Sequence, residues 1–314
     1  MGNKIATREA YGKALVKLSN INDKVVVLDA DLSKSTKTAE FKAVAPERFI
    51  NMGIAEGNMM GVAAGLATCG KIPFASSFAM FAAGRAFEQI RNSICYPKLN
   101  VKICATHAGL TVGEDGATHQ SVEDISLMRS IPNMTVINPA DAVETEAAIL
   151  AVAEYDGPCY VRLGRLAVET INDAENYKFE IGKGVTLAEG SDVTIVATGM
   201  MVQLALEAKK ELSKEGINAR IINIHTIKPI DSELLVKAAK ETGAIVTAEE
   251  HSIIGGLGSA VAEAVTEEYP VPVVKVGIKD TFGESGKPDQ LLEKYGLTVE
   301  AIVNSAKRAI SLKK

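Results

Sequence analysis

Apolar and polar residues follow one another along this chain in blocks whose length and period are typical of alternating strands and helices. In the first half, short apolar runs at residues 25–30, 101–105, 134–138 and 159–163 predict strands. Strands that are apolar on both faces and separated by helices indicate a parallel sheet covered by helices on each side. The intervening helices are expected at residues 56–68, 81–94 and 141–154.

The chain becomes polar and irregular at residues 169–191, which we interpret as a linker. A second α/β unit follows it, so the pattern predicts an α/β protein of two domains, at residues 1–180 and 190–314. The strands of this unit are expected at 193–197, 219–224, 244–248 and 271–276, and its helices at 202–214, 232–240 (capped near Asp231), 258–268, 289–293 and 299–310.

Composition narrows the class of protein. The 314 residues are 47% hydrophobic and 23% charged, which is ordinary for a globular chain, and the formal net charge of -5 argues against a nucleic-acid partner. No apolar run is long enough to span a bilayer, and the first residues have no signal-peptide core, so no membrane association is expected. The four cysteines show no CxxC spacing, which favours a reduced, cytoplasmic protein with no metal site of its own.

The segment Thr106–Gln120, THAGLTVGEDGATHQ, is the richest in chemistry. It follows an apolar strand-like run and combines two histidines, two adjacent carboxylates and several glycines without a regular period. Histidine titrates near neutral pH, and glycine lets the backbone approach a ligand closely. A ligand-binding loop is therefore favoured over an ordinary surface loop.

Glu56 is the one carboxylate in the small and apolar run of residues 51–70. Desolvation favours the protonated form of such a group, so it can exchange a proton or hydrogen-bond a ring nitrogen. A position in the first turn of a helix, where a carboxylate complements the helix dipole, explains Glu56 equally well. The spacing alone does not separate these two interpretations.

Two further patterns have both a structural and a functional interpretation. Phe78 and Phe81 could form an apolar wall for a flat ring, although two core aromatics are the ordinary explanation. Gly255-Gly-Leu-Gly258 precedes a helix and could bind an anion there, although a packing turn is favoured.

Basic and hydroxyl side chains follow several of the predicted strands. The guanidinium groups of Arg8, Arg162 and Arg165 could hold a phosphate, and Ser33 and Ser35 add hydroxyl donors just past the first strand. The carboxyl ends of parallel strands are the usual ligand-binding edge of such a sheet. Each of these residues taken alone also fits a solvated surface.

Taken together, these segments resemble the C-terminal half of transketolase, and the resemblance covers nearly the whole chain. The matching blocks occur in the family's order, which makes the resemblance specific. They are Ala6–Gly12, Asp29–Ser35, the Glu56 block, the Phe78–Phe81 block, Thr106–Gln120, Gly157–Arg165, Ser191–Gly199, Ile224–Asp231 and Ile278–Gly286.

The resemblance implies a pyrimidine-binding domain followed by a transketolase C-terminal domain, with thiamine diphosphate as cofactor. The family glutamate that matches Glu56 hydrogen-bonds the aminopyrimidine ring and exchanges a proton with it. By residue matching, the catalytic residues are Glu56 and His119, and Asp31, Glu56, Phe78 and Phe81 contact the cofactor. The same matching assigns substrate binding to Arg8, Ser35, His107, Asp115, His119 and Arg165.

One family motif is missing from the chain. The diphosphate-binding domain of transketolases carries a GDG motif and a distant Asn that hold Mg²⁺ and the diphosphate, and no GDG tripeptide occurs here. The resemblance is therefore to the C-terminal subunit of a split transketolase, working in the pentose phosphate pathway. A separate N-terminal subunit would supply the Mg²⁺ ligands, in a heterotetramer with two of each chain.

Other members of the thiamine enzymes remain possible at this stage. A relative of 1-deoxyxylulose-5-phosphate synthase or the beta subunit of a 2-oxo acid dehydrogenase would share the Glu-bearing helix. A non-catalytic homologue that kept the fold is a further alternative. The paired histidines of Thr106–Gln120 and the basic residues favour a transketolase that acts on sugar phosphates.

Overall fold

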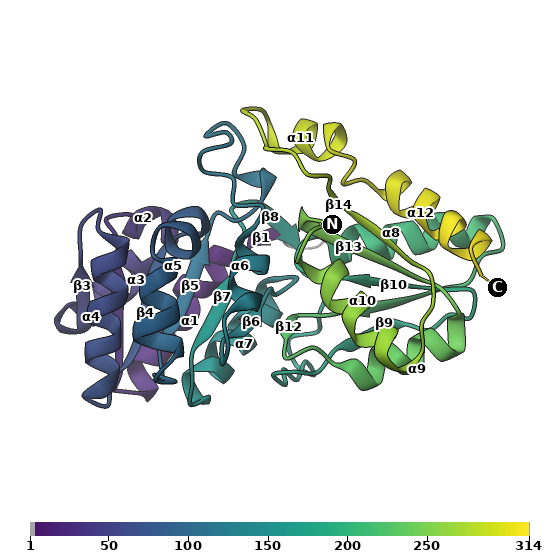
Figure 1. The fold of residues 1–314 in the computed structure, drawn as a ribbon. Coiled ribbons are helices and arrows are strands. Elements are labelled where there is room, and N and C mark those ends of the chain that lie inside the picture. The colour runs from purple at the N-terminus through teal and green to yellow at the C-terminus, as the bar shows by residue number, and fades with distance from the viewer. Residues whose placement is uncertain (1–3, 314) are drawn as a thin grey trace.

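The structure is a computed structural model that describes residues 4–313 and arranges them in two α/β bodies (Figure 1). Residues 1–3 and 314, the outer ends of the two predicted domains, lie outside the described residues. The first body is built on a seven-stranded sheet of order β12-β6-β7-β5-β4-β2-β3, in which only the β12–β6 pair is antiparallel. Its strands are β2 (Val25–Asp29), β3 (Phe49–Asn51), β4 (Ile72–Phe78), β5 (Lys102–Thr106), β6 (Thr135–Ile137), β7 (Cys159–Arg162) and β12 (Thr226–Lys228).

Helices cover both faces of this sheet, as the apolar strands predict. On one face α1, α3 and α7 pack against alternate strand residues such as Val25 and Val27. On the other face α4, α6 and two π-helical turns pack against Val26 and Leu28. The elements are α1 (Thr7–Ile21), α2 (Ser33–Thr36), α3 (Thr38–Val44), α4 (Glu56–Thr68), the π-helical turns Met80–Arg85 and Ile90–Cys95, α5 (Phe87–Gln89), α6 (Asp124–Ser130) and α7 (Ala142–Glu154).

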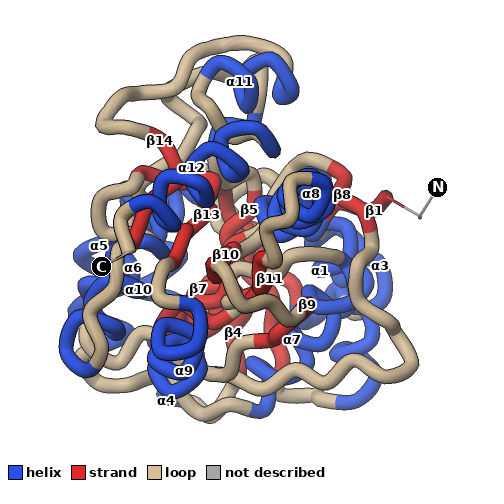
Figure 2. The backbone as a smooth tube through the Cα atoms, turned by 90° about the vertical axis from the view of Figure 1, so that its right-hand side faces the viewer, coloured by secondary structure: helices blue, strands red, loops and turns tan. Residues whose placement is uncertain are grey.

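The second body holds a five-stranded sheet of order β14-β13-β10-β11-β9, parallel except for β9. Helices α8 and α12 cover one face and α9 and α10 the other, while α11 projects beside the first body (Figures 1 and 2). The strands are β9 (Val185–Ala188), β10 (Val193–Ala197), β11 (Ala219–Asn223), β13 (Ile245–Ser252) and β14 (Val273–Ile278), and the helices are α8 (Met201–Lys214), α9 (Ser232–Thr242), α10 (Leu257–Glu268), α11 (Pro288–Lys294) and α12 (Val299–Ser311).

The predicted strands and helices are confirmed, except that residues 81–94 form two π-helical turns joined by the short α5 and not one α-helix. Several further elements were not expected from the sequence. Helix α1 forms although no helix was predicted there, and β9 forms inside the segment interpreted as a linker. Only half-buried residues make up β9, so it lacks the continuous apolar run that indicates a strand. Where the polar segment begins, β8 (Ala167–Glu169) pairs with β1 (Lys4–Ala6).

The two bodies are connected through a shared β-sheet. Strand β12 comes from the second half of the chain and extends the first sheet by pairing with β6.

All four cysteines are free thiols, and Cys69 is the exposed one. Within residues 4–313, every helix is too short or too polar to cross a lipid bilayer.

Candidate active site

The predicted site residues gather at one edge of the seven-stranded sheet. Strands β2, β4, β5 and β7 are parallel, so their carboxyl ends open on the same side. Ser77 and Phe78 end β4, Thr106 ends β5, and Arg162 ends β7. This edge brings together side chains that are far apart in the sequence.

Glu56 begins α4 and is 1% exposed, so the structure combines the two interpretations left open by the sequence: a buried carboxylate in the first helical turn. The Ser77 hydroxyl donates a hydrogen bond to Glu56 Oε1 at 3.2 Å. Arg85 Nη1 lies 2.8 Å from Glu56 Oε2, and the Arg85 side chain is 51% exposed. The carboxylate therefore has one fixed neighbour and one neighbour that solvent can reach.

An aromatic surface stands beside this carboxylate. The rings of Phe78 and Phe81 are 6.2 Å apart and nearly parallel, and His107 stacks on Phe78 with ring centroids 3.9 Å apart. His119 meets Phe81 edge-on at 5.2 Å. The guanidinium of Arg85 lies 4.7 Å from the Phe81 ring centroid. Phe81 is half-buried, so this pair is a wall at a surface and not only part of the core.

We call Thr106–Gln120 the site loop. It leaves β5 at His107, which has a positive φ of 56° and is 4% exposed, and it contains a 3-10 turn at Leu110–Val112. Its first half is buried, whereas its tip at Glu114 and Asp115 is exposed. His119, near its end, is half-buried and bonds the Thr118 hydroxyl through Nδ1 at 2.9 Å. The loop is thus mostly enclosed, unlike an ordinary surface loop.

The basic residues predicted to hold phosphate meet around His107. Arg8 Nη1 donates to the Ser35 carbonyl at 2.7 Å, and Arg165 contacts the Val112 carbonyl and the Glu114 carboxylate. Burial, and then the charges of Arg8 and Arg165, lower the pKa of His107 to about 3. Burial also lowers the pKa of Arg8, and the nearby Arg165 adds to this effect. Two cations and a neutral imidazole can therefore bind an anion here.

Asp31 lies at the same edge but in a separate group. It follows β2 with a positive φ of 66°, is exposed, and accepts a hydrogen bond from Asn51 Nδ2 at 3.0 Å. The turn after β2 is organised by buried Asp29, which accepts bonds from the Leu32 amide and the Thr36 hydroxyl. This turn fixes where Asp31 and Ser35 stand.

Arg162 does not belong to the phosphate group, contrary to one interpretation of the sequence. It is 4% exposed, and its Nε lies 2.8 Å from the Asp124 carboxylate. It also donates to the Glu250 carbonyl in the second body at 2.9 Å. A buried arginine needs internal partners, and these partners make Arg162 part of the contact between the two bodies.

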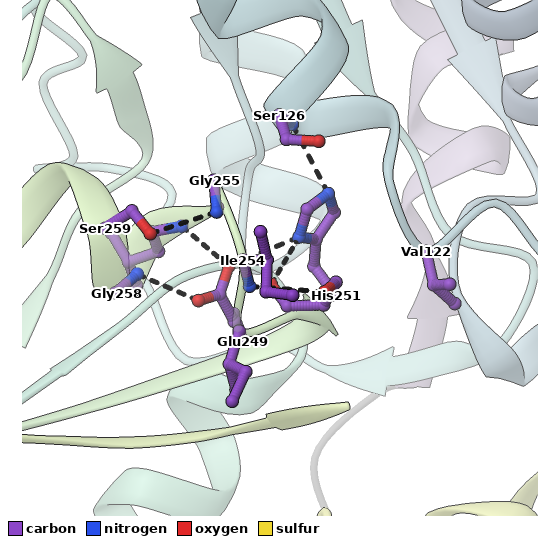
Figure 3. Close-up of polar contacts among 12 residues, drawn as sticks. Val122, Ser126, Glu249, His251, Ile254, Gly255, Gly258 and Ser259 are labelled. Carbon is purple, nitrogen blue, oxygen red and sulfur yellow. Dashed lines mark hydrogen bonds and ion pairs between the residues drawn. The ribbon is translucent and has the colours of Figure 1, made fainter. Parts of the chain in front are cut away.

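The glycine-rich turn before α10 is a packing turn and leaves no room for an external anion (Figure 3). The Glu249 carboxylate already accepts hydrogen bonds from the backbone amides of Leu257 at 2.6 Å and Gly258 at 2.8 Å. A Cβ atom at Gly256 would lie 2.0 Å from Glu249 Oε2. The helix N-terminus is satisfied by a carboxylate of the chain itself.

Two contributors to this site were not singled out from the sequence: Ser77 and Arg85. Ser77 carries no signal beyond its place at the end of a strand. Arg85 is the only charged residue in the run from Ser76 to Phe87, which could have marked it. Among residues 4–313 there is no group of three or more His, Cys, Asp or Glu side chains arranged to hold a metal ion.

Both halves of the chain match known families. Residues 3–170 match "Transketolase, pyrimidine binding domain", and residues 182–302 match "Transketolase, C-terminal domain". A protein named as a transketolase C-terminal section, from Methanocaldococcus jannaschii, is 56% identical over 94% of this chain and 93% of its own length. The 6-deoxy-6-sulfo-D-fructose transketolase subunit of a Clostridium species is 48% identical over 95% of this chain and 92% of its own.

Solved structures agree with these matches. A split gene transketolase described as an inactive beta4 tetramer superposes with a TM-score of 0.93, with 63% identity, and covers 99% of this chain and 100% of its own. Human transketolase is 38% identical over 99% of this chain but only 50% of its own length, so the chain corresponds to half of a full-length enzyme. Thiamine diphosphate is the cofactor that this family implies. The chain is a split transketolase-like subunit and belongs to the transketolase family.

Proposed function

We propose that this chain is the C-terminal subunit of a two-chain transketolase, which moves a two-carbon ketol unit from a ketose phosphate to an aldose phosphate. The observation that carries the proposal is the environment of Glu56. Its carboxylate is buried beside the rings of Phe78 and Phe81, and its ion-pair partner, Arg85, is half-exposed and can be replaced by a ligand. The proposal also includes the cytoplasm as location, from the pattern of the cysteines, and the pentose phosphate pathway as context, from the family resemblance.

The residues around Glu56 suit the aminopyrimidine of thiamine diphosphate. A buried carboxyl group can hydrogen-bond a ring nitrogen, while Phe78 and Phe81 present apolar surface to the ring. Arg85 must then give up its contact with Glu56 Oε2. Asp31 is proposed to lie near the bound cofactor. When bound, the cofactor supplies the electron sink that carbon–carbon cleavage requires.

Substrate recognition is assigned to the group around His107. Arg8 and Arg165 supply charged donors for the phosphate, with Ser35 and neutral His107 as further hydrogen-bonding groups. Asp115 and His119, on the second half of the site loop, are proposed to contact sugar hydroxyls. We further propose that His119 takes part in proton transfer during catalysis, because it stands beside Phe81 at the wall.

The partner is proposed to be an N-terminal transketolase subunit that carries the GDG motif and the Mg²⁺ ligands, absent from this sequence. A heterotetramer with two of each chain would complete two sites. The 63% identical split gene transketolase, described as an inactive beta4 tetramer, supports the expectation that this kind of chain does not work alone.

The donor sugar is left open by the relatives. One subunit is named for 6-deoxy-6-sulfo-D-fructose and another, from Phocaeicola vulgatus, for apulose-4-phosphate. The two arginines near His107 can hold either a phosphate or a sulfonate, because both are tetrahedral anions that accept several hydrogen bonds. We favour a phosphate, since it carries more charge to match two guanidinium groups.

Reconstitution tests the proposal. The chain alone should give no ketol transfer, and mixing it with its N-terminal partner, thiamine diphosphate and Mg²⁺ should restore transfer from ketose phosphates to aldose phosphates. Robust turnover by the isolated chain would refute the split-subunit assignment. A reconstituted enzyme that consumes pyruvate but no ketose phosphate would favour the 1-deoxyxylulose-5-phosphate synthase or 2-oxo acid dehydrogenase alternatives, and an inert complex would favour the non-catalytic one.

A further inference from the structure

The site loop is fastened to the second body by Gln120, which the proposed function does not use. Gln120 is 3% exposed, and its Nε2 has three carbonyl oxygens within hydrogen-bond distance. Two of them, those of Leu110 and Gly113, at 3.2 Å each, belong to the site loop itself. The third and shortest contact, 2.9 Å, is to the Glu284 carbonyl of the second body. One side-chain amide thus closes the loop on itself and ties it to another domain.

We call residues 279–287 the C-terminal loop. It meets the site loop at distances that only glycine allows: a Cβ at Gly283 would lie 1.9 Å from Gln120 Oε1, and a Cβ at Gly116 would lie 2.5 Å from Ser285 Oγ. Figures 1 and 2 show the region around α11, which follows the C-terminal loop, projecting from the body of the molecule. The two loops are therefore closely packed against each other.

A second attachment lies deeper. The Glu250 carboxylate on β13 accepts a hydrogen bond from the Thr111 amide at 2.7 Å, and a Cβ at Gly109 would lie 2.3 Å from the Glu250 carboxyl carbon. The site loop is therefore held by the second body near its start, through Glu250, and at its end, through Gln120. His107, Asp115 and His119, three of the proposed substrate contacts, belong to this same loop.

We propose that the second domain supports the substrate site by holding the site loop in its binding shape, and that Gln120 is the positioning residue for this. A segment without regular structure costs free energy to order when a ligand binds. If hydrogen bonds to the second body already hold the site loop in its binding shape, substrate binding does not have to supply that free energy. Loss of these hydrogen bonds should therefore change KM more than the rate of the chemical step. The kinetic part of the inference rests on the proposed function.

The test compares Gln120→Leu with Gln290→Leu. Gln290 is exposed on α11, close in sequence to the C-terminal loop, so the second variant makes the same chemical change at a side chain that contributes none of the hydrogen bonds described above for the site loop. In the isolated chain, Gln120→Leu should increase amide hydrogen exchange across residues 110–120, and Gln290→Leu should not. In the reconstituted enzyme, Gln120→Leu should raise KM for sugar phosphates roughly tenfold, with kcat and cofactor affinity within about twofold of wild type.

A double-mutant cycle covers the case in which Gln120→Leu folds poorly. Gly283→Ala should raise KM because its methyl group would lie 1.9 Å from Gln120 Oε1. Adding Gln120→Ala should remove most of that extra effect, since the nearest obstructing atom is then gone and the remaining one, Leu110 Cδ2 at 2.8 Å, is the end of a flexible side chain. Additive effects in this cycle, or an unchanged KM with unchanged exchange in Gln120→Leu, would overturn the inference. A wild-type complex without ketol transfer would instead overturn the proposed function, while the exchange data would still test the fastening.

Discussion

A buried carboxylate lies at the start of α10 and another at the start of α4, and the difference between the two separates a structural contact from a site. At α10, Glu249 is fully buried and both its oxygens accept backbone amides, which cannot leave without unwinding the helix (Figure 3). At α4, Glu56 is equally buried, but its partners are the Ser77 hydroxyl and a half-exposed Arg85. A buried carboxylate can serve a ligand only when its partners can be exchanged.

The largest effect expected from this comparison is on catalysis. Glu56→Gln keeps the shape of the side chain but removes its proton exchange, so kcat of the reconstituted enzyme should fall by about 10² to 10⁴-fold. Melting temperature should change little, because the amide can still accept from Ser77. Glu249→Gln is the matched control: it should keep kcat at low temperature. Near-normal turnover by Glu56→Gln would remove the catalytic role.

The same contrast distinguishes two arginines at the ends of the strands. Arg165 has an exposed partner, Glu114, whereas Arg162 is enclosed with Asp124. Arg165→Ala should raise KM for phosphorylated sugars roughly tenfold, because a charged contact to phosphate is lost. Arg162→Ala should instead lower the free energy of unfolding by about 3–5 kcal/mol, since it leaves a buried carboxylate unpaired.

Steady-state kinetics with phosphorylated and unphosphorylated donors measure the first effect, and denaturant unfolding measures the second. The KM of an unphosphorylated donor should not respond to Arg165→Ala. If both donors lost affinity equally, Arg165 would act on the shape of the site loop, through its contact with the Val112 carbonyl, and not on phosphate.

The third prediction uses the pH dependence of stability near α10. Burial raises the pKa of Glu249 to about 7, so between about pH 4.5 and 7 the folded state keeps a proton there that the unfolded state has released. Burial lowers the pKa of His251 to about 4, so between about pH 4 and 6.5 the unfolded state holds a proton there that the folded state lacks. As pH rises, Glu249 therefore makes stability fall, and His251 makes it rise.

These two contributions oppose each other over nearly the same pH range. Relative to wild type, Glu249→Gln should make the free energy of unfolding rise more steeply with pH between 4.5 and 6.5, and His251→Gln should make it rise less steeply or fall. Each slope should change by up to about 1.4 kcal/mol per pH unit, the value for one proton. Chemical denaturation at several pH values measures both slopes; identical slopes in the two variants would show that the groups do not titrate separately.

The sequence predicts the strands and helices better than it predicts which polar side chains are available to bind a ligand and which are already paired within the chain. Apolar runs indicated α4, β5 and β7; Glu56 begins α4, and His107 and Arg165 follow β5 and β7. What the pattern cannot reveal is the partner of each charge. Arg162 and Arg165 look alike in the sequence, and only the long-range contact with Asp124 tells them apart.

Glycines show the same limit. Gly255-Gly-Leu-Gly258 has the composition of an anion-binding turn, but the anion is supplied by Glu249 of the neighbouring strand. Gly116 belongs to a segment whose glycines predict close approach to a ligand, but it lies against Ser285 of a second loop that is distant in sequence, and Gly283 likewise lies against Gln120. Long-range contacts of this kind follow from tertiary packing and not from local pattern.

The smallest expected effect concerns Arg85, the exchangeable partner of Glu56. The Arg85 side chain is 51% exposed, so water can take over part of its contact with the buried Glu56, and a glutamine there can still donate a hydrogen bond. Arg85→Gln should therefore lower the free energy of unfolding by about 1 kcal/mol, less than Arg162→Ala. It should tighten thiamine diphosphate binding roughly threefold in the reconstituted complex, since the ring no longer displaces a guanidinium from the carboxylate. Cofactor titration followed by fluorescence, with Arg91→Gln as an exposed control on the neighbouring π-helical turn, measures the affinity. Weaker binding by Arg85→Gln would mean that Arg85 helps to hold the cofactor, and that the partner of Glu56 stays in place when the site fills.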